Sequence, residues 1–257
     1  MIGYNHLGRN GRLGNQMFQY AALRGIAANH NYEWCIPPST FKNPEKDHQL
    51  FGAFKLPSVK NVEMLGATYV GEKSFTFDED LFKNCSDNVN LYGFFQTEKY
   101  FKHIEQQIRE DFNFVDEVSN PCREMFNFDE VISLHIRRTD YVNRQDYHPL
   151  CSMEYYENAL SKFSKNIPVL IFSDEPEWCM KQEIFESDRF MISETRNNVL
   201  DLCLMTMCNY HIIANSSFSW WGAWLSDSKK VIAPKVWFGE SANIDDNDLV
   251  PERWERI

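Results

Sequence analysis

Two adjacent arginines, Arg137 and Arg138, directly follow an apolar run with the composition of a buried strand, residues 131–136 (VISLHI). Cations that end such a strand lie at its carboxyl end, where open α/β sheets bind ligands. Each guanidinium presents a fixed fork of N–H donors that matches phosphate oxygens, so the pair predicts an anionic ligand. The alternative is a surface ion-pair network, since exposed basic pairs are common.

A glycine-rich segment, residues 8–14, is the second candidate for ligand binding. Apolar residues at helical spacing follow it from Leu13 to about Asn29. Glycines allow a backbone to approach a ligand closely, and the first N–H groups of a helix attract anions. The segment lacks the Gly-Lys-Ser/Thr of a P-loop and the G-x-G-x-x-G of a dinucleotide-binding turn. On its residues alone, it is either a ligand-binding loop or an ordinary loop-to-helix turn.

Polar residues also follow two other apolar runs. Asp174 comes after residues 169–172 (VLIF), at the expected carboxyl end of a strand, where its carboxylate can contact a ligand. Its alternative role is to cap the helix expected from residue 175. Ser216 and Ser217 open another expected helix, where hydroxyl and N–H groups suit phosphate binding.

Alternating strands and helices must position these residues, and the pattern predicts a parallel sheet covered on both faces. The strands expected in the second half are 131–136, 167–173, 189–193, 210–214 and 231–233. The helices expected there begin near 152, at 175–186, at 198–208 and from 217, and in this last helix we expect Trp220, Trp221 and Trp224 in the core. Upstream we expect a helix over 13–29, strands at 32–36 and 89–95 and a helical segment at 97–112, whereas residues 39–88 show no clear pattern.

Composition narrows the class of protein. The 257 residues suffice for one large or two small domains, and a net charge of −11 argues against a nucleic-acid partner. Seven dispersed cysteines without C-x-x-C spacing indicate reduced thiols. Neither a secretory signal nor an apolar run of ~20 residues is present, so we expect a cytoplasmic protein. The oligomeric state is not fixed by these features.

Five segments of the chain, taken together, resemble the α-1,2-fucosyltransferases of glycosyltransferase family eleven. In chain order they are 11–22 (GRLGNQMFQYAA), 93–101 (GFFQTEKYF), 135–141 (HIRRTDY), 172–175 (FSDE) and 215–225 (NSSFSWWGAWL). Each segment alone is a weak signal, but five in order over most of the chain are a strong one.

The resemblance implies an α/β fold with two Rossmann-like domains facing across a cleft, the GT-B type. Residues 1–125 would form the acceptor side and residues 126–257 the GDP-fucose-binding side, with a boundary near 115–128. The implied reaction is inverting transfer of L-fucose from GDP-fucose to a sugar hydroxyl, foremost O2 of a terminal β-galactoside. A lipid-linked acceptor would bring peripheral membrane contact. The alternatives are another acceptor or GDP-sugar, or a binding module without turnover, although retention of both arginines favours an enzyme.

The resemblance also implies roles for individual residues. Arg137 would clamp the β-phosphate of departing GDP, with Arg138 as a supporting donor, and His135 would either fix the nucleotide or form a structural hydrogen bond. Asp174 would accept from both N1–H and N2–H of guanine, a pairing that adenine cannot offer. The expected donor-binding residues are Gly11, Arg12, Gly14, Asn15, His135, Arg137, Asp174, Ser216, Ser217 and Phe218. The expected catalytic residues are Arg137, Arg138, Asp140, Asp146 and His148.

The general base stays open among Asp140, Asp146 and His148, which follow the arginine pair. Asp140 is the better candidate to hold an arginine in place. Related α-1,6 enzymes have a glutamate near the position of Gln145, so the chain departs from them there.

One D-x-D sequence, Asp78 to Asp80, is of the type that chelates a metal–diphosphate in another glycosyltransferase architecture. Its polar, loosely patterned surroundings predict a solvated turn, since a hard cation needs converging ligands. The tandem arginines bring the positive charge that a metal would supply. We therefore expect no metal and no cofactor other than GDP-fucose as the donor substrate.

Overall fold

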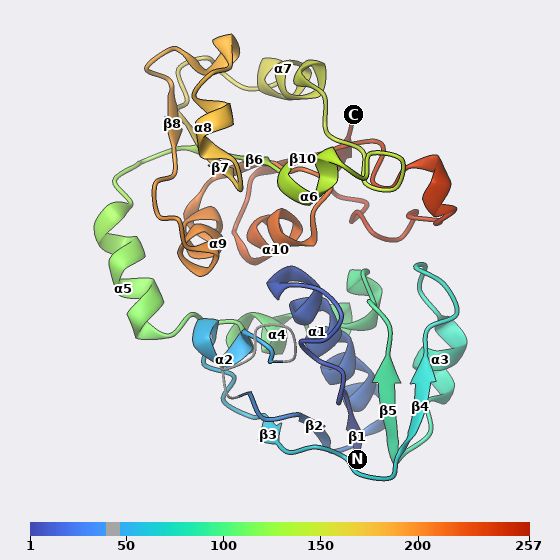
Figure 1. Cartoon of the computed structure of the whole chain (residues 1–257). Helices are drawn as coiled ribbons and strands as arrows, with labels where there is room; N and C mark the ends of the chain where they lie inside the picture. The colour runs from blue at the N-terminus through green and yellow to red at the C-terminus, as the bar shows by residue number, and fades with distance from the viewer. Residues whose placement is uncertain (40–46) are drawn as a thin grey trace. The chain divides into compact units, whose positions relative to one another are not determined.

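The computed structural model describes residues 1–39 and 47–257, which form two compact α/β units (Figure 1). Unit 1 comprises Met1–Val115 and Asp245–Pro251, and unit 2 comprises Asp116–Ile244 and Glu252–Ile257. Each unit contains one sheet whose paired strands all run parallel. The α/β class is thereby confirmed, with two parallel sheets.

The first unit ends at Val115, whereas the sequence predicted a boundary at 125/126. Val115 nevertheless lies within the region 115–128 where the boundary was expected. Residues 116–125 form a helix of unit 2, α5 (Asp116–Met125), which packs against α9 (Asn198–Met207). Val118 and Cys122 are buried, and the Cys122 thiol donates to the Leu200 carbonyl at 3.6 Å.

Unit 1 has the strand order β3-β2-β1-β5-β4. The strands are β1 (Ile2–Gly3), β2 (Trp34–Ile36), β3 (Lys60–Asn61), β4 (Thr68–Gly71) and β5 (Val89–Tyr92). The helices are α1 (Leu13–His30), α2 (Leu50–Ala53), α3 (Glu79–Asn84), α4 (Glu105–Asp111) and the 3-10 helices Glu98–Tyr100 and Lys102–Ile104. Short elements thus occupy the described part of 39–88, where the sequence showed no pattern; residues 40–46 lie outside the described ranges.

The long helix α1 is the core element of unit 1 and packs against β1 and β2 (Figure 1). It confirms the helix predicted over 13–29 and ends at Asn31, whose left-handed backbone (φ 54°) returns its N–H to Ala27 and Ala28. Gly25 allows a close approach, because a Cβ there would lie 2.0 Å from the Tyr100 carbonyl oxygen. The segment predicted as one helix over 97–112 is broken into two 3-10 helices and α4.

Unit 2 has the strand order β11-β10-β9-β6-β7-β8, with β6 in the interior. Its strands are β6 (Ile132–Ile136), β7 (Val169–Ser173), β8 (Phe190–Ile192), β9 (Tyr210–Ile212), β10 (Lys230–Ala233) and β11 (Glu255–Arg256). The remaining helices are α6 (Thr139–Val142), α7 (Met153–Ser161), α8 (Pro176–Cys179), α10 (Ser217–Leu225) and the 3-10 helices Glu183–Phe185 and Glu240–Ala242. The predicted strands are confirmed within a few residues, whereas the helix predicted over 175–186 already ends at Cys179.

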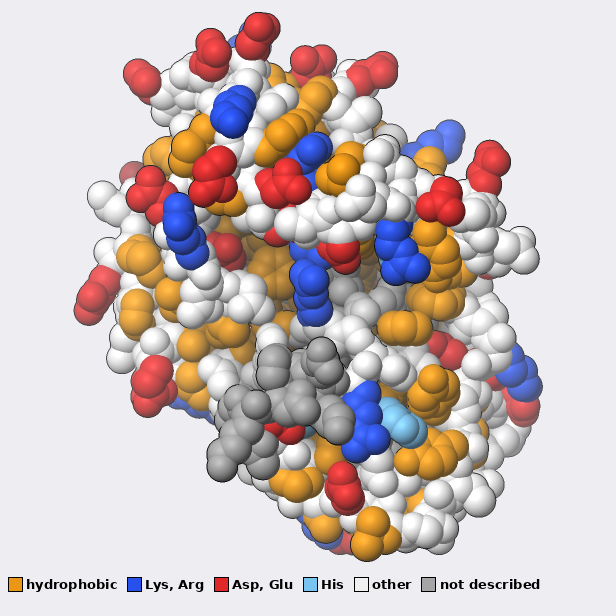
Figure 2. All heavy atoms as spheres, viewed as in Figure 1, with side chains coloured by type: hydrophobic (Ala, Val, Ile, Leu, Met, Phe, Trp, Pro, Cys, Tyr) orange, Lys and Arg blue, Asp and Glu red, His pale blue; other side chains and the backbone are white. Residues whose placement is uncertain are grey.

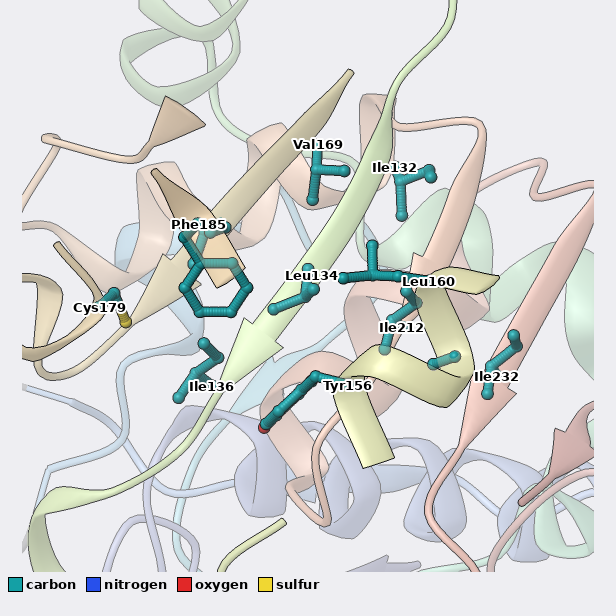
Figure 3. Packing of buried hydrophobic residues seen from close by; sticks show 12 residues of the cluster. Ile132, Leu134, Ile136, Tyr156, Leu160, Val169, Cys179, Phe185, Ile212 and Ile232 are labelled. Carbon is teal, nitrogen blue, oxygen red and sulfur yellow. The ribbon is translucent and has the colours of Figure 1, made fainter. Parts of the chain in front are cut away.

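Alternation along β6 separates the core from the candidate site. Ile132, Leu134 and Ile136 are buried in a cluster with α7 and the neighbouring strands, as Figure 3 shows. His135 alternates with them and hydrogen-bonds to Ser219 of α10. The three tryptophans of α10 are at most 1% exposed, which confirms the prediction that they belong to the core.

The described surface is acidic in balance but mixed in sign. On the face in Figure 2, acidic and basic side chains are interspersed. No helix among residues 1–39 and 47–257 is both long and apolar enough to cross a bilayer.

Candidate active site

The carboxyl end of β6 carries Arg137, whose guanidinium is held by two carboxylates. Its two terminal nitrogens donate to Asp174, after β7, and to Asp140 in α6. The guanidinium carbon also lies 5.3 Å from the centre of the Tyr141 ring. The pairing of Asp140 with an arginine is the arrangement that the sequence favoured over a catalytic role.

The side chain of Arg138 contacts two residues that follow β7, Glu175 and Trp178. Its Nε donates to Glu175 at 2.9 Å, and its guanidinium carbon lies 3.8 Å from the centre of the Trp178 ring. Stacking and a charge-assisted bond together fix the plane of the guanidinium. The Arg138 side chain therefore links the ends of β6 and β7, and its expected role as a supporting phosphate donor stays a prediction.

Asp174 joins the ends of these two strands. Its Oδ1 accepts from the backbone N–H of Arg138 at 2.9 Å, and its Oδ2 accepts from Arg137 and from Thr139 Oγ1 at 2.6 Å. The capping interpretation is wrong, because the N-cap of α8 is Glu175, which makes no side-chain cap. The guanine-binding role of Asp174 stays a prediction, and a base would have to compete with three donors.

His135 is buried on the face of β6 that meets α10. Its Nδ1 lies 2.9 Å from Ser219 Oγ, and its ring centre lies 5.6 Å from that of Phe218. Burial lowers the pKa of His135, so the imidazole is neutral at physiological pH. The structure thus shows a structural hydrogen bond, and contact of His135 with a nucleotide stays a prediction.

The start of α10 presents the serines predicted to bind phosphate. Ser216 is the N-cap residue, and its hydroxyl accepts from the N–H of Phe218 at 3.4 Å, while Ser217 is the first helical residue. Asn215 before them was not predicted as a site residue. Its side-chain amide donates to the carbonyls of Pro149 and Trp237, both at 2.9 Å, so it ties this turn to the loop after α6. Its place at the head of the 215–225 segment was an available signal.

The loop after α6 contains the two other candidates for a general base. The ring of His148 stacks on Tyr141 with centres 4.5 Å apart and planes inclined by 9°. Burial lowers the pKa of His148, which favours the neutral form that can accept a proton. Asp146 is exposed and held at Ser241, whose hydroxyl donates to its carbonyl at 2.7 Å. Of the candidates for the general base, His148 is the one that stacks on Tyr141, the ring that the Arg137 guanidinium also contacts.

In unit 1 the glycine-rich loop lies between β1 and α1. Gly11 has φ +94°, and Gly11 and Arg12 are exposed. A Cβ at Gly11 would lie 2.2 Å from Asn15 Nδ2, so the turn requires glycine there. Arg12 is the N-cap residue of α1 without a side-chain cap, and Gly14 is buried in the first turn.

Two of the five segments of the family pattern, 11–22 and 93–101, meet in unit 1. Gln96 Nε2 donates to Asn15 Oδ1 at 2.9 Å. Gln19 Nε2 donates to the carbonyls of Asn10 at 3.0 Å and Gly93 at 3.1 Å. Residues 93–96 thus support the glycine-rich loop from the neighbouring strand β5.

Asp201 in α9 is a further carboxylate at the carboxyl edge of the sheet of unit 2 that the sequence interpretation missed. Its Oδ1 accepts from Ser193 Oγ at 2.5 Å and from Thr195 Oγ1 at 2.7 Å, both of which follow β8. Burial raises the pKa of Asp201. The available signal was the pair of hydroxyl residues after a strand, but the apolar helix pattern of 198–208 concealed the carboxylate.

The D-x-D sequence does not form a converging site. Asp78 is buried, not solvated as predicted: it caps α3 by accepting from Leu81 N–H at 3.0 Å. Asp80 is exposed and pairs with Lys73 at 2.9 Å. Among the described residues, no three His, Cys, Asp or Glu side chains are grouped so as to hold a metal ion.

Unit 2 thus carries tandem arginines at the end of an interior strand, and unit 1 carries a glycine-rich loop before its first long helix. The sequence model described as "Glycosyl transferase family 11" matches residues 1–255. The chain therefore belongs to this family.

Curated relatives agree with this assignment. The chain is 32% identical to an "Alpha-1,2-colitosyltransferase" of Escherichia coli, with 96% of each protein covered. It is 23% identical to the "Galactoside 2-alpha-L-fucosyltransferase SEC1" of Bos taurus, covering 86% of this chain and 64% of that protein.

Solved structures show the same fold. The NodZ α-1,6-fucosyltransferase soaked with GDP-fucose has a TM-score of 0.59 at 13% identity, covering 91% of this chain and 94% of that chain. POFUT1 in complex with GDP has a TM-score of 0.53 at 14% identity, covering 88% and 94%.

Proposed function

We propose that the protein transfers L-fucose from GDP-fucose to O2 of a terminal β-galactoside, with inversion at the anomeric carbon. Arg137 carries the proposal, because its position at the end of β6 and its two carboxylate partners make it an oriented phosphate clamp. The linkage is supported by relatives named for α-1,2 transfer and the nucleotide by the likeness to folds solved with GDP or GDP-fucose. The GT-B arrangement, with unit 1 on the acceptor side and unit 2 on the nucleotide side, is part of this proposal.

The two carboxylates around Arg137 play unequal parts in the clamp. The Asp174 side chain is 19% exposed and shares its charge among three donors, so it fixes the guanidinium. The Asp140 side chain is 50% exposed and pairs with Arg137 three residues earlier in the chain. An exposed ion pair of this kind contributes little stability. The diphosphate replaces Asp140 as the partner of the outer guanidinium nitrogen. Arg137 then stabilises the charge that develops on departing GDP.

Inversion requires a single displacement in which the acceptor hydroxyl loses a proton as the glycosyl bond breaks. The transition state has oxocarbenium character, as glycosyl cleavage generally does. His148 accepts the proton, since its lowered pKa keeps it neutral and its stacking on Tyr141 orients the ring. Asp146 is exposed, and its Oδ2 accepts from Ser241 Oγ at 3.3 Å. Asp140, once the diphosphate has displaced it from Arg137, is the second candidate for the base.

The guanine is recognised at the carboxyl edge of the sheet of unit 2 by a carboxylate. Two candidates exist there, Asp174 and Asp201. Asp174 already accepts from three donors at the end of β6, whereas Ser193 and Thr195 both donate to Oδ1 of Asp201. Asp201 therefore replaces Asp174 as the candidate that accepts from N1–H and N2–H of guanine.

A second donor deserves a direct comparison, because the relative with 32% identity is named for colitose transfer. Colitose is the 3-deoxy form of L-fucose, so the two donors differ by one hydroxyl. A site that hydrogen-bonds a hydroxyl rejects the analogue that lacks it by large factors, whereas an apolar pocket discriminates little. The ratio of kcat/KM for the two donors therefore identifies the sugar.

The deciding experiment is GDP release from GDP-fucose and GDP-colitose with a panel of β-galactosides, β-glucosides and 2-deoxygalactosides, free and lipid-linked. We expect turnover with β-galactosides, none with the 2-deoxy compounds, and an α-1,2 linkage in the product by NMR. Product from the 2-deoxygalactoside would refute O2 as the acceptor atom. GDP binding without release in every mixture would favour the non-catalytic binding module.

A further inference from the structure

Glu72 makes an unusual set of contacts directly after β4, in a part of the sequence without a recognisable pattern. Its Oε1 accepts from the backbone N–H of Phe94 at 2.6 Å and of Phe95 at 3.0 Å. Its Oε2 accepts from Phe95 N–H at 3.1 Å. Both carboxylate oxygens are thus used to hold the turn that follows β5.

The geometry of this turn depends on the approach of Glu72. Gly93 has φ +154°, and a Cβ there would lie 2.7 Å from Glu72 Oε1. Only glycine combines this backbone angle with so close a carboxylate. The Tyr4 hydroxyl, at the end of β1, completes the turn by accepting from the N–H of Gly93 at 2.9 Å.

Residues 93–96, which form this turn, also hold the glycine-rich loop in place. Gln96 binds Asn15, and Gln19 binds the carbonyls of Gly93 and Asn10, one on each side of the interface between the two segments. A continuous path of hydrogen bonds therefore runs from Glu72 through residues 93–96 to the loop at residues 8–14.

We propose that Glu72 is a positioning residue for sugar-nucleotide binding, which fixes residues 93–96 and through them Asn15 and the glycine-rich loop. This inference rests on the proposed function together with the donor-binding role that the family resemblance implies for Gly11, Arg12, Gly14 and Asn15, by which the loop of unit 1 contacts the donor bound to unit 2. Glu72 does not act as the general base, because both of its oxygens accept backbone N–H groups.

The protonation state of Glu72 sets the strength of this support. Burial raises the pKa of Glu72 to about 7, and Asp78 adds to the effect, whereas the N–H groups of Phe95 and Phe94 lower it. The other titratable groups facing it, Tyr4 and Tyr100, have pKa values raised by burial and stay neutral. Lys73 beside it is drawn to Asp80. A protonated Glu72 is a weaker acceptor, so the turn loosens as the pH falls below about 7.

Activity and stability should respond to this proton in opposite directions. The folded-state pKa of Glu72 lies above its ordinary value of 4.5, so its contribution to stability is complete below 4.5 and is lost as the pH rises through about 7. Donor binding, in contrast, improves over the same window as the carboxylate forms. A purely structural role would move activity and stability together.

The test compares Glu72→Gln with Glu63→Gln, which removes an exposed carboxylate from the same unit. For Glu72→Gln we expect a KM for GDP-fucose about tenfold higher at pH 8, with kcat changed less, because a charged acceptor of two N–H groups is lost. The acid limb of kcat/KM near pH 7 should disappear in Glu72→Gln and persist in Glu63→Gln. The melting temperature of wild type minus that of Glu72→Gln should rise from pH 8 to pH 5.

A second variant, Gln96→Ala, leaves Glu72 and its partners intact and removes only the hydrogen bond between residue 96 and Asn15. Its effect on the donor KM should not add to that of Glu72→Gln, since both act on the same loop. Wild-type donor KM and an unchanged acid limb in Glu72→Gln would overturn the inference. Wild-type protein that turns over no GDP-sugar would instead refute the proposed function.

Discussion

The two units hold their candidate site residues by different physical means. In unit 2, two arginines and three carboxylates from the ends of β6 and β7 bind one another, with Asp174 at the centre. In unit 1, neutral amides of Asn15, Gln19 and Gln96 bind backbone carbonyls and each other, and the one carboxylate, Glu72, binds backbone N–H groups.

This difference assigns different work to the units. Charged groups that are already oriented can stabilise charge in a transition state at no further cost, so the arginine–carboxylate network of unit 2 should govern kcat, whereas the guanine contact proposed for Asp201 lies outside this network and acts on binding. Amide contacts fix the shape of a loop, and each is worth about 1 kcal/mol, so unit 1 should govern the KM for the donor. Substitutions that reverse this division would break the comparison.

The largest effect is expected at Arg137 in unit 2. Arg137→Ala should lower kcat by a few hundredfold, equivalent to ~3–4 kcal/mol, because an oriented cation opposite the leaving diphosphate is lost. Arg137→Lys should also fail, since a point charge cannot satisfy Asp174 and phosphate through one planar fork. Steady-state kinetics with GDP-fucose measures both, with the exposed Arg123→Ala as control. Turnover near the wild-type rate in Arg137→Ala would end the clamp assignment.

His148 tests whether the base also belongs to unit 2. His148→Phe keeps a ring that can stack on Tyr141 but cannot accept a proton, so kcat should fall by about a hundredfold with little change in melting temperature. Because burial lowers the pKa of His148, the acid limb of kcat at saturating donor should lie below the ordinary value of 6.5. Stability linked to His148 is present above 6.5 and lost as the pH falls through its folded-state pKa. A normal kcat in His148→Phe would return Asp146 to consideration.

The centre of unit 2 could be predicted because β6 and β7 have five residues each and are almost entirely buried. Residues 132–136 are all buried, and a continuous apolar run of this kind announces a central parallel strand. Unit 1 offers little of this signal: β1 and β3 have two residues each, and Lys60 and Asn61 are exposed. Tertiary pairing alone gives such segments their strand conformation.

The residues of the candidate site could also be predicted only in part from the sequence. The arginines were visible as a local motif, but the bond between Arg137 and Asp174 joins positions 37 residues apart, and no local pattern encodes it. The role of Glu72 could not be predicted for a related reason: its partners are backbone N–H groups, which every residue type except proline offers. A carboxylate that binds backbone leaves no complementary residue type in the sequence.

Guanine recognition provides a smaller effect within unit 2. Asp201→Asn should weaken GDP binding by about tenfold, since it removes a charged acceptor. Inosine diphosphate lacks the 2-amino group, so the preference for GDP over it should shrink in Asp201→Asn and persist in Asp174→Asn. Calorimetry with both nucleotides measures this. Loss of the preference in Asp174→Asn alone would restore Asp174 as the guanine ligand.

The smallest effect on rate is expected from the D-x-D residues of unit 1, although Asp78 matters to the fold. Activity should survive excess EDTA, because Arg137 and the start of α10 already present positive potential to a diphosphate. Asp78→Ala should lower stability by about 1 kcal/mol through loss of the α3 cap, without changing kcat below the melting temperature.

Asp78→Asn separates capping from chelation, because asparagine caps a helix as well as aspartate does but is a poorer ligand for a hard cation. We expect Asp78→Asn to match wild type in both melting temperature and kcat. We expect the same of Asp80→Ala, since the contacts of Asp80 with Lys73 and Asn84 are both exposed. Activity that EDTA abolishes and Mn²⁺ or Mg²⁺ restores, together with an inactive but stable Asp78→Asn, would place charge stabilisation in unit 1. That result would remove the division of work between the units, because the amide-built unit would then supply the charge that Arg137 is proposed to supply.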